Sequence, residues 1–246
     1  MTKSPDELMA LRFGAASAGE NLHRAIESGQ LIENKDGTLE LPGDPRQGVN
    51  WMYVSNGPVL DCGFLMYFMF AHAYAESAVP QGCSACYKVK VVLRTLRELV
   101  AAWELAKRIE CRSKWGTDLY NPYSQNIYAG YFYVAGLDAA RTSFKVVREA
   151  IDADPKLGPE IAMTIKRGCS EYEVKLGPSD RYAFTPEMAE LETYLKSRFR
   201  ERRAAHYPSM VAAHWIETAF RLGDDTYLDF TGGKRLRKST MTYDPQ

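Results

Sequence analysis

The spacing of apolar residues predicts helices along most of this chain. The clearest pattern covers residues 86–110, where apolar side chains recur at the i, i+3, i+4, i+7 spacing of one helix face. Residues 5–32 show the same spacing and predict one or two helices, with Ser4 as N-cap before Pro5. The apolar run within residues 62–77 is shorter than the ~20 residues that span a bilayer. It predicts a buried core helix.

Four shorter segments are also predicted to be helical: residues 136–153, 158–168, 186–203 and 206–222. Residues 34–56 are rich in Gly, Pro, Asn and Asp and predict a long loop, with a short strand over Thr38–Leu41. Residues 115–135 interrupt the helical pattern with glycine, asparagine and proline, which indicates a second loop. The tail from Asp224 onward has no helical period, so an extended or poorly ordered segment is expected.

These elements predict a mainly α fold. One domain, residues 1–246, would contain about seven helices, with a long loop after the first helical segment and an irregular C-terminal tail. A doubly wound fold needs strands that alternate with helices, and the pattern lacks such strands.

The composition is that of an ordinary globular protein. The 246 residues include 31 Lys plus Arg and 31 Asp plus Glu, so the formal net charge is zero. This balance excludes a basic field over the whole surface of the kind that collects nucleic acid or anionic membrane. The first 14 residues lack the basic head and apolar run of a signal peptide, so we expect a cytoplasmic protein and no membrane partner.

Cysteines carry the candidate chemistry. In a reducing compartment five cysteines favour metal binding or catalysis over disulfides. Cys83 and Cys86 form a C-x2-C pair, which lets two thiolates converge on one metal centre, and Cys169 follows Gly168 in a turn. With Cys111 they make four candidate ligands of a [4Fe-4S] cluster, because clusters tolerate varied ligand spacing.

Two alternatives to a cluster remain open. A structural zinc site usually has a second close pair of ligands, which this sequence lacks, and buried cysteines can also be simple core residues without metal. Cys62 lies in the apolar run and is interpreted as core, although it is the substitute for Cys111 if Cys111 is not a ligand. A straight helix over residues 86–110 would place Cys111 roughly 37 Å from Cys86. This distance argues against Cys111.

Polar and aromatic residues near these cysteines predict a substrate pocket. Cationic side chains beside an anionic cluster can raise its potential or hold an acidic partner, and phenol groups can hydrogen-bond to cluster sulfurs. The same residues are equally typical of core packing and a solvated helix face. The pocket candidates are Tyr120, Tyr123, Tyr128, Tyr131, Tyr133, Lys88 and Arg167.

The sequence thus predicts an iron-sulfur protein whose cluster lies beside a Tyr-lined pocket and serves redox chemistry or substrate activation. If it is an enzyme, it is an iron-sulfur oxidoreductase or lyase acting on a small molecule or with a redox partner; no catalytic residue can be assigned. The alternatives are a zinc- or cluster-containing regulatory or nucleic-acid-binding module, and a metal-free helical enzyme or interaction protein. Nucleic acid is the minority partner, suggested by the basic runs 196–203 and 234–238.

Overall fold

The protein has a mixed α/β fold, not the mainly α fold that the sequence pattern predicts. The computed structural model describes residues 3–43, 50–57, 61–117, 126–201 and 207–237. Helices make up 47% of the structure and strands 19%, so the fold-class prediction is wrong. The error comes from segments whose apolar positions fit the spacing of a helix and also fit the alternation of a strand.

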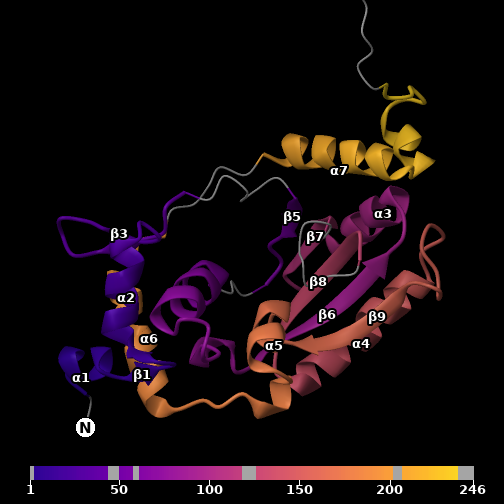
Figure 1. Ribbon diagram of the computed structural model, residues 1–246. Coiled ribbons are helices and arrows are strands. Elements are labelled where there is room, and N and C mark those ends of the chain that lie inside the picture. The colour runs from indigo at the N-terminus through magenta and orange to yellow at the C-terminus, as the bar shows by residue number, and fades with distance from the viewer. Residues whose placement is uncertain (1–2, 44–49, 58–60, 118–125, 202–206, 238–246) are drawn as a thin grey trace, which may run out of the picture.

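A five-stranded antiparallel sheet organises one half of the molecule (Figure 1). Its strands pair in the spatial order β5-β7-β8-β6-β9. Their bounds are β5 Trp51–Val54, β6 Cys86–Leu93, β7 Ser113–Thr117, β8 Tyr128–Ala135 and β9 Ala162–Arg167. From β6 onward the chain follows a β-α-β-β-α-β order, in which α3 (Leu96–Ala106) links β6 to β7 and α4 (Leu137–Asp152) links β8 to β9.

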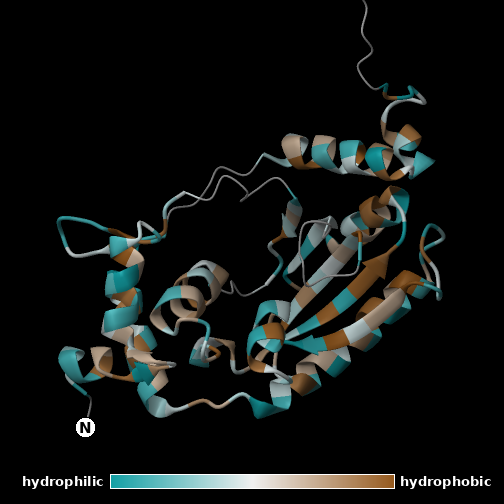
Figure 2. Cartoon of the chain, viewed as in Figure 1, coloured by the Kyte–Doolittle hydropathy of each residue, from teal (hydrophilic) through white to brown (hydrophobic). Residues whose placement is uncertain are grey.

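The strand β6 replaces the first part of the helix predicted over residues 86–110. Lys88 and Lys90 alternate with Val89 and Val91, and both valines are fully buried. Figure 2 shows this alternation along β6 as bands of opposite hydropathy. A period of two places the valines on the face that packs against helices and the lysines on the other face. Only the second part of the segment is helical, as α3, after Thr95 caps it.

Three further predictions fail for the same reason. The long loop predicted over residues 34–56 contains β5, which pairs with β7. The pattern predicts a loop over residues 115–135, but they contribute to β7 and β8, separated by residues that lie outside the described part of the chain. It predicts a helix over residues 158–168, but they contain β9. These segments are strands because they pair with β6 and with each other, and pairing over long sequence separations is not visible in local periodicity.

The other half of the molecule is helical. A hydrophobic cluster joins the N-terminal helices, the helix η1 (Gly63–Ala73) and α6, and Figure 1 shows α1, α2 and α6 apart from the sheet. The remaining α-helices are α1 Pro5–Met9, α2 Ala18–Glu27, α5 Ser170–Leu176, α6 Pro186–Arg198 and α7 Pro208–Leu222. The predicted helices near residues 5–32, 136–153, 186–203 and 206–222 are therefore present, some with shorter bounds.

Helix η1, Gly63–Ala73, occupies the predicted core helix, but it is a π-helix with wide turns. Phe68, Met69 and Ala73 on it are completely buried. None of the described helices combines the length and the apolar composition that crossing a bilayer requires.

Short elements complete the chain. Two small hairpins are formed by β1 Arg12–Phe13 with β2 Ala16–Ser17 and by β3 Ile32–Glu33 with β4 Leu39–Glu40; the short helical turns are η2 Gln81–Cys83, η3 Ser179–Arg181 and η4 Asp225–Phe230. Strand β4 falls within the strand predicted over Thr38–Leu41. The tail is a helical turn over η4, followed by irregular chain as far as the described residues extend.

The main core lies between the sheet and α3, α4 and α7. Trp115 from β7 and Trp215 from α7 are its largest buried side chains. The opposite face of the sheet is turned away from these helices, and it carries one side of the candidate site.

Candidate cysteine site

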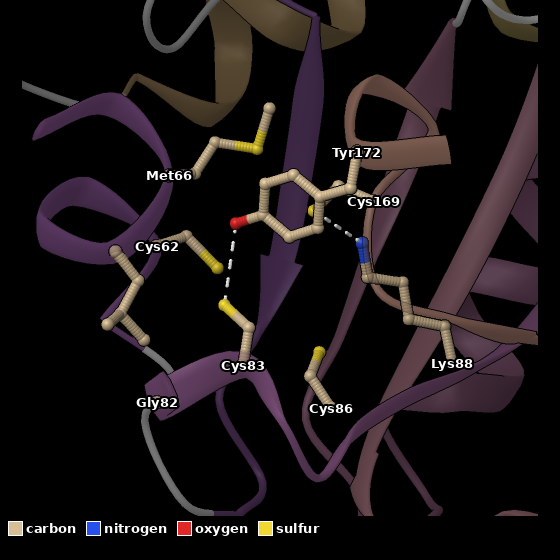
Figure 3. Close-up of a pocket in the computed structure, with 9 residues that line it drawn as sticks. Cys62, Met66, Gly82, Cys83, Cys86, Lys88, Cys169 and Tyr172 are labelled. Atoms are coloured by element: carbon tan, nitrogen blue, oxygen red, sulfur yellow. Dashed lines mark hydrogen bonds between the residues drawn. The ribbon is translucent and has the colours of Figure 1, made fainter. Parts of the chain in front are cut away.

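Four cysteines line one cavity between the sheet, η1 and α5 (Figure 3). They are Cys62, Cys83, Cys86 and Cys169, and all are free thiols. Leu65, Met66, Gly82, Lys88 and Tyr172 complete the lining. Three of the four predicted ligands are therefore together, and the fourth cysteine at the cavity is Cys62, which the sequence pattern assigns to the core.

The pairing of β6 with β9 brings Cys86 and Cys169 side by side. Tyr87 pairs with Arg167, and the next backbone contact is from Gly168 N–H to the carbonyl of Cys86 at 2.9 Å. Gly168 has φ +65°, a left-handed conformation that disfavours other residues, and it turns the chain so that Cys169 begins α5. The C-x2-C pair and the distant Cys169 thus meet because two strands far apart in the chain lie next to each other.

The turn before β6 positions Cys83. Residues 81–83 form a short 3₁₀ turn, η2, in which the Cys83 N–H donates to the carbonyl of Pro80 at 2.9 Å. Glu192 from α6 accepts from the backbone N–H groups of Gln81 and Gly82, at 2.5 and 2.8 Å, and from the Tyr74 hydroxyl at 2.8 Å. We call residues 81–83 the cysteine turn. The Glu192 carboxylate connects this turn to the helical half of the molecule, and burial raises the pKa of Glu192.

Arg167 fixes the same turn from the sheet. Its guanidinium donates to the carbonyl of Ser84, inside the C-x2-C pair, at 3.0 Å and to that of Ser179 at 2.9 Å. The sequence places Arg167 among the residues of a substrate pocket. It lies outside the cavity lining and contacts the backbone that carries the cysteines.

Cys62 reaches the cavity from the beginning of η1. It caps the N-terminus of that helix, and Figure 3 shows its sulfur directed toward that of Cys83. The residue before Cys62 is Asp61, whose side chain accepts from the Phe64 N–H at 3.1 Å and pairs with Lys196 of α6. No spacing rule would have paired Cys62 with the C-x2-C motif, because η1 reaches the sheet only through tertiary packing.

Cys111 lies elsewhere. Its sulfur is within 3.4 Å of the carbonyl of Tyr133 and 3.6 Å of the carbonyl of Arg112, and the side chain packs against the main core. It follows α3, and the chain returns to the sheet at β7. The distance objection from a continuous helix therefore disappears, but Cys111 still does not reach the cavity that the other four cysteines share.

Burial favours the protonated form of three of the cavity thiols. Burial raises the pKa of Cys62 and of Cys83, and it raises the pKa of Cys86 to about 11. The Tyr172 hydroxyl lies 3.4 Å from the Cys83 sulfur, a contact that lowers the Cys83 pKa but by less than burial raises it. A metal would have to displace these protons to bind, since thiolates are the ligands.

Lys88 is the charged group of the cavity. Its residue is 7% exposed, its ammonium donates to the Cys169 sulfur at 3.1 Å, and it lies 5.4 Å from the centre of the Tyr133 ring. Burial opposes the charge, but the neighbouring sulfur and phenol groups outweigh it and raise the Lys88 pKa well above its ordinary value. Within the described part of the chain no carboxylate forms an ion pair with Lys88.

The predicted tyrosine pocket is only partly at this site. Tyr133 lies beside Lys88, whereas Tyr128 is at the far end of β8 and donates to Asp224 at 3.0 Å. Tyr131 faces Lys90 and Lys114 on the sheet. Tyr120 and Tyr123 lie outside the described residues. The tyrosine that lines the cavity is Tyr172, three residues after Cys169, which the sequence interpretation missed.

The basic runs contact other parts of the chain. Arg198 donates to the Gly37 carbonyl at 2.8 Å, and Arg200 pairs with Asp36 at 2.8 Å. Arg235 lies 3.8 Å from Asp225. Residues 202–206 and Lys238 are outside the described chain. These three arginines of the two runs therefore have partners within the molecule.

The four sulfurs do not stand at the spacing of a bound metal ion. Within the described ranges no group of three or more His, Cys, Asp and Glu side chains is close enough to hold one as the side chains lie. The cavity has about 10 Å³ of free space, roughly what a single water needs. Binding of a metal centre would therefore require the thiol side chains to rotate. Comparison with known protein families, curated proteins and solved structures finds no match for this chain.

Proposed function

We propose that the protein is an iron-sulfur protein in which Cys62, Cys83, Cys86 and Cys169 hold a [4Fe-4S] cluster. The observation that carries the proposal is that four of the five cysteines, from three separate segments of the chain, line one cavity. Four thiol ligands are the number that such a cluster takes, and clusters accept ligands at irregular spacing along the chain.

The buried ammonium of Lys88 supports an anionic occupant. A buried charge costs free energy unless an opposite charge or hydrogen bonds compensate it. The ammonium of Lys88 donates to the sulfur of Cys169, and sulfur is a weak hydrogen-bond acceptor. Thiolates bound to iron would place negative charge directly against the ammonium.

Redox chemistry is the use that this ligand set favours. When four cysteines bind the four irons, no iron is left open to a substrate, so electron transfer is favoured over substrate activation. A cytoplasmic location belongs to the same proposal, because free thiols persist in reducing compartments. Zinc is the alternative occupant: a zinc site with four cysteine ligands needs only one ion in a small space.

Metal analysis of anaerobically purified protein tests the proposal. We expect about four iron and four sulfide per chain and broad absorption near 400 nm that bleaches on reduction. One equivalent of zinc per chain and no iron would indicate a structural zinc site in place of the cluster. Protein without either metal, and without a cluster after reconstitution with iron and sulfide, would overturn the proposal.

Matched cysteine variants test the ligand set. Cys62→Ser and Cys169→Ser should each lose most of the bound iron, whereas Cys111→Ser should retain it, because Cys111 lies outside the cavity. The opposite result, with iron lost in Cys111→Ser and kept in Cys62→Ser, would show that the ligands are those of the sequence-based prediction.

A further inference from the structure

The contact between Lys88 and Cys169 brings a lysine nitrogen against a cysteine sulfur inside the protein. The two atoms lie 3.1 Å apart, and the lysine residue is 7% exposed. Figure 3 shows the Lys88 side chain extended toward the Cys169 sulfur, whereas the sulfurs of Cys62 and Cys83 are directed toward each other. The nitrogen and the sulfur are therefore close enough to be joined through one intervening atom.

Strand pairing holds the two residues in this position. Lys88 on β6 pairs with Lys166 on β9, and two residues later the Gly168 N–H donates to the carbonyl of Cys86 at 2.9 Å. Cys169 follows directly as the N-cap of α5. Hydrogen-bonded backbone thus positions both the strand that carries the lysine and the turn that carries the cysteine.

Lys88 differs from Lys166, its partner on β9, in what its nitrogen contacts. Lys166 pairs with the carboxylate of Glu173 at 2.8 Å, whereas no carboxylate of the described chain pairs with Lys88. Besides the Cys169 sulfur, the Lys88 ammonium faces the ring of Tyr133, whose centre is 5.4 Å away. A buried lysine is costly without an opposite charge. Here its nearest polar contact is a sulfur, which is a reactive group.

The cavity gives a small oxidant access to this pair. It holds about 10 Å³ of free space, roughly what a single water needs. Leu65, Met66 and the Tyr172 ring supply much of its lining, and apolar cavities admit small uncharged molecules. Cys169 is only partly buried, so solvent also approaches the sulfur. Dioxygen, an uncharged molecule of two atoms, is an oxidant that suits this space.

We propose that dioxygen joins Lys88 and Cys169 of the metal-free protein in a covalent nitrogen–oxygen–sulfur bridge. One amine, one thiol and one dioxygen give one bridge and one water: an N–O and an S–O bond form, and an N–H, the S–H and the O–O bond break. Of the three hydrogens on the amine and the thiol, one stays on nitrogen and two leave in the water; an ammonium beside a thiolate holds the same three. Nitrogen and sulfur each give up two electrons, and dioxygen takes up all four. Cysteines beside cationic groups are readily oxidised.

The bridge makes the cavity sensitive to oxygen. It links β6 covalently to the start of α5, and it removes Cys169 from the proposed cluster ligands. Two molecules of dithiothreitol reverse it: they supply four hydrogens, become two cyclic disulfides, and restore the amine and the thiol with release of water. The effect on cluster loading rests on the proposed function, whereas the formation of the bridge does not.

Mass spectrometry of the full chain tests the proposal. The protein is purified anaerobically, its metal is removed with a chelator, and one portion is exposed to air-saturated buffer. We expect the exposed chain to gain the mass of one oxygen atom less that of two hydrogen atoms, and to return to the parent mass with dithiothreitol.

Peptide mapping identifies the bonded atoms. A disulfide and a sulfenic acid in the same chain would give the same total mass as the bridge. Digestion of the exposed chain should therefore yield one cross-linked peptide pair that contains Lys88 and Cys169 and is separated by dithiothreitol. Absence of this cross-link after exposure to air, whether the mass is unchanged, lowered by a disulfide or raised by added oxygen, would overturn the proposal.

Two matched pairs of variants locate the bridge. Lys88→Arg and Cys169→Ser should each abolish the cross-link, whereas Lys166→Arg, on the neighbouring strand, and Cys111→Ser, outside the cavity, should retain it. If Lys88→Arg does not fold, Lys88→Met replaces it. A reducible link from Cys169 to another lysine in Lys88→Arg, or loss of the cross-link in Lys166→Arg, would contradict the assignment.

Reconstitution with iron and sulfide separates this proposal from that of the cluster. The bridged chain should take up iron only after reduction with dithiothreitol, because Cys169 is then free again. A chain that forms the bridge but binds no iron after reduction would overturn the cluster and support the bridge. Equal iron uptake before and after reduction would contradict the claim that the bridge removes a cluster ligand.

Discussion

The ammonium of Lys88 and the sulfur of Cys169 lie 3.1 Å apart, although 81 residues separate them in the chain. The contact joins the middle of the sheet to the residue that caps α5, and the lysine that makes it is buried. A lysine on a strand that pairs with β9 can reach a thiol that follows β9. This contact places the positive charge of the site against one of its proposed ligands.

Replacement of Lys88 should change a different property in the metal-free and in the metal-loaded protein. In the metal-free protein Lys88→Met removes a buried cation that has no carboxylate partner among the described residues, so the melting temperature should stay the same or rise. In the loaded protein the same variant removes positive charge from the cluster, so the reduction potential should become more negative. Lys88→Arg should keep the potential close to that of the parent. Calorimetry and protein-film voltammetry measure the two effects; an unchanged potential in Lys88→Met would separate Lys88 from the cluster.

Loss of the Glu192 carboxylate should release the cysteine turn. Glu192→Leu removes the acceptor of the partly buried N–H groups of Gln81 and Gly82, and a hydrogen bond to a charged group contributes about 1.5–3 kcal/mol. We expect the free energy of unfolding by urea to fall by about this amount, together with weaker metal retention. Glu190→Gln on the same helix is the control. Full stability in Glu192→Leu would show that water can replace the carboxylate.

Gly130 is a packing requirement of the sheet. A methyl group at this position would overlap the six-membered part of the Trp115 ring, which is 1% exposed. Gly130→Ala should therefore destabilise the protein by about 1–3 kcal/mol, the usual cost of overpacking. Gly43→Ala, where the added carbon meets no neighbour within 4 Å, should be nearly neutral. Equal melting temperatures for the two variants would mean that the indole moves aside without cost.

His214 should make the protein less stable in mild acid. Burial lowers its pKa, although Glu217 acts in the opposite direction, and its ring lies 3.5 Å from the Thr117 hydroxyl. The unfolded chain therefore binds a proton more readily than the folded chain, so the stability is present above about pH 6.5 and is lost as the pH falls through this value.

Thermal denaturation between about pH 7.5 and about pH 5.5 measures this effect. The decrease in melting temperature should be smaller in His214→Gln than in the parent protein. The same substitution at the exposed His23, which pairs with Glu27, serves as control. Some dependence on pH should remain in His214→Gln, because burial also lowers the pKa of His72. A steeper decrease in His214→Gln than in the parent would contradict the assigned role.

The residue pattern alone was enough for the isolated helices and for part of the cysteine site. Helices α4, α6 and α7 bury one side against a neighbour, so their periodicity is readable locally. The C-x2-C spacing singled out Cys83 and Cys86, and Gly168 before Cys169 marked a turn that the structure contains. Lys88, which the sequence analysis names as a pocket candidate, lies 3.1 Å from the Cys169 sulfur. These features depend on residues that are close together in the chain.

The sequence of β6 contains the alternation of a strand, but the helical pattern that continues into α3 dominated the prediction. Lys88, Val89, Lys90 and Val91 alternate with a period of two, yet their valines also fit the longer helical pattern that continues into α3. Short apolar runs are ambiguous in this way. Tyr131 and Tyr133 on β8 likewise alternate with Phe132, which is buried. Recognising both alternations would have predicted a pair of strands.

Only the tertiary structure decided that Cys62 lies with Cys83, Cys86 and Cys169 while Cys111 does not. Cys62 precedes the apolar helix η1, and its local sequence is that of a core residue. It reaches the cavity because Glu192 and Lys196 of α6 hold both the cysteine turn and the start of η1. Cys111 lies away from the cavity because β6 ends before it and α3 returns the chain across the sheet to β7. Contacts between segments far apart in the chain set these positions, and no local pattern of residues encodes them.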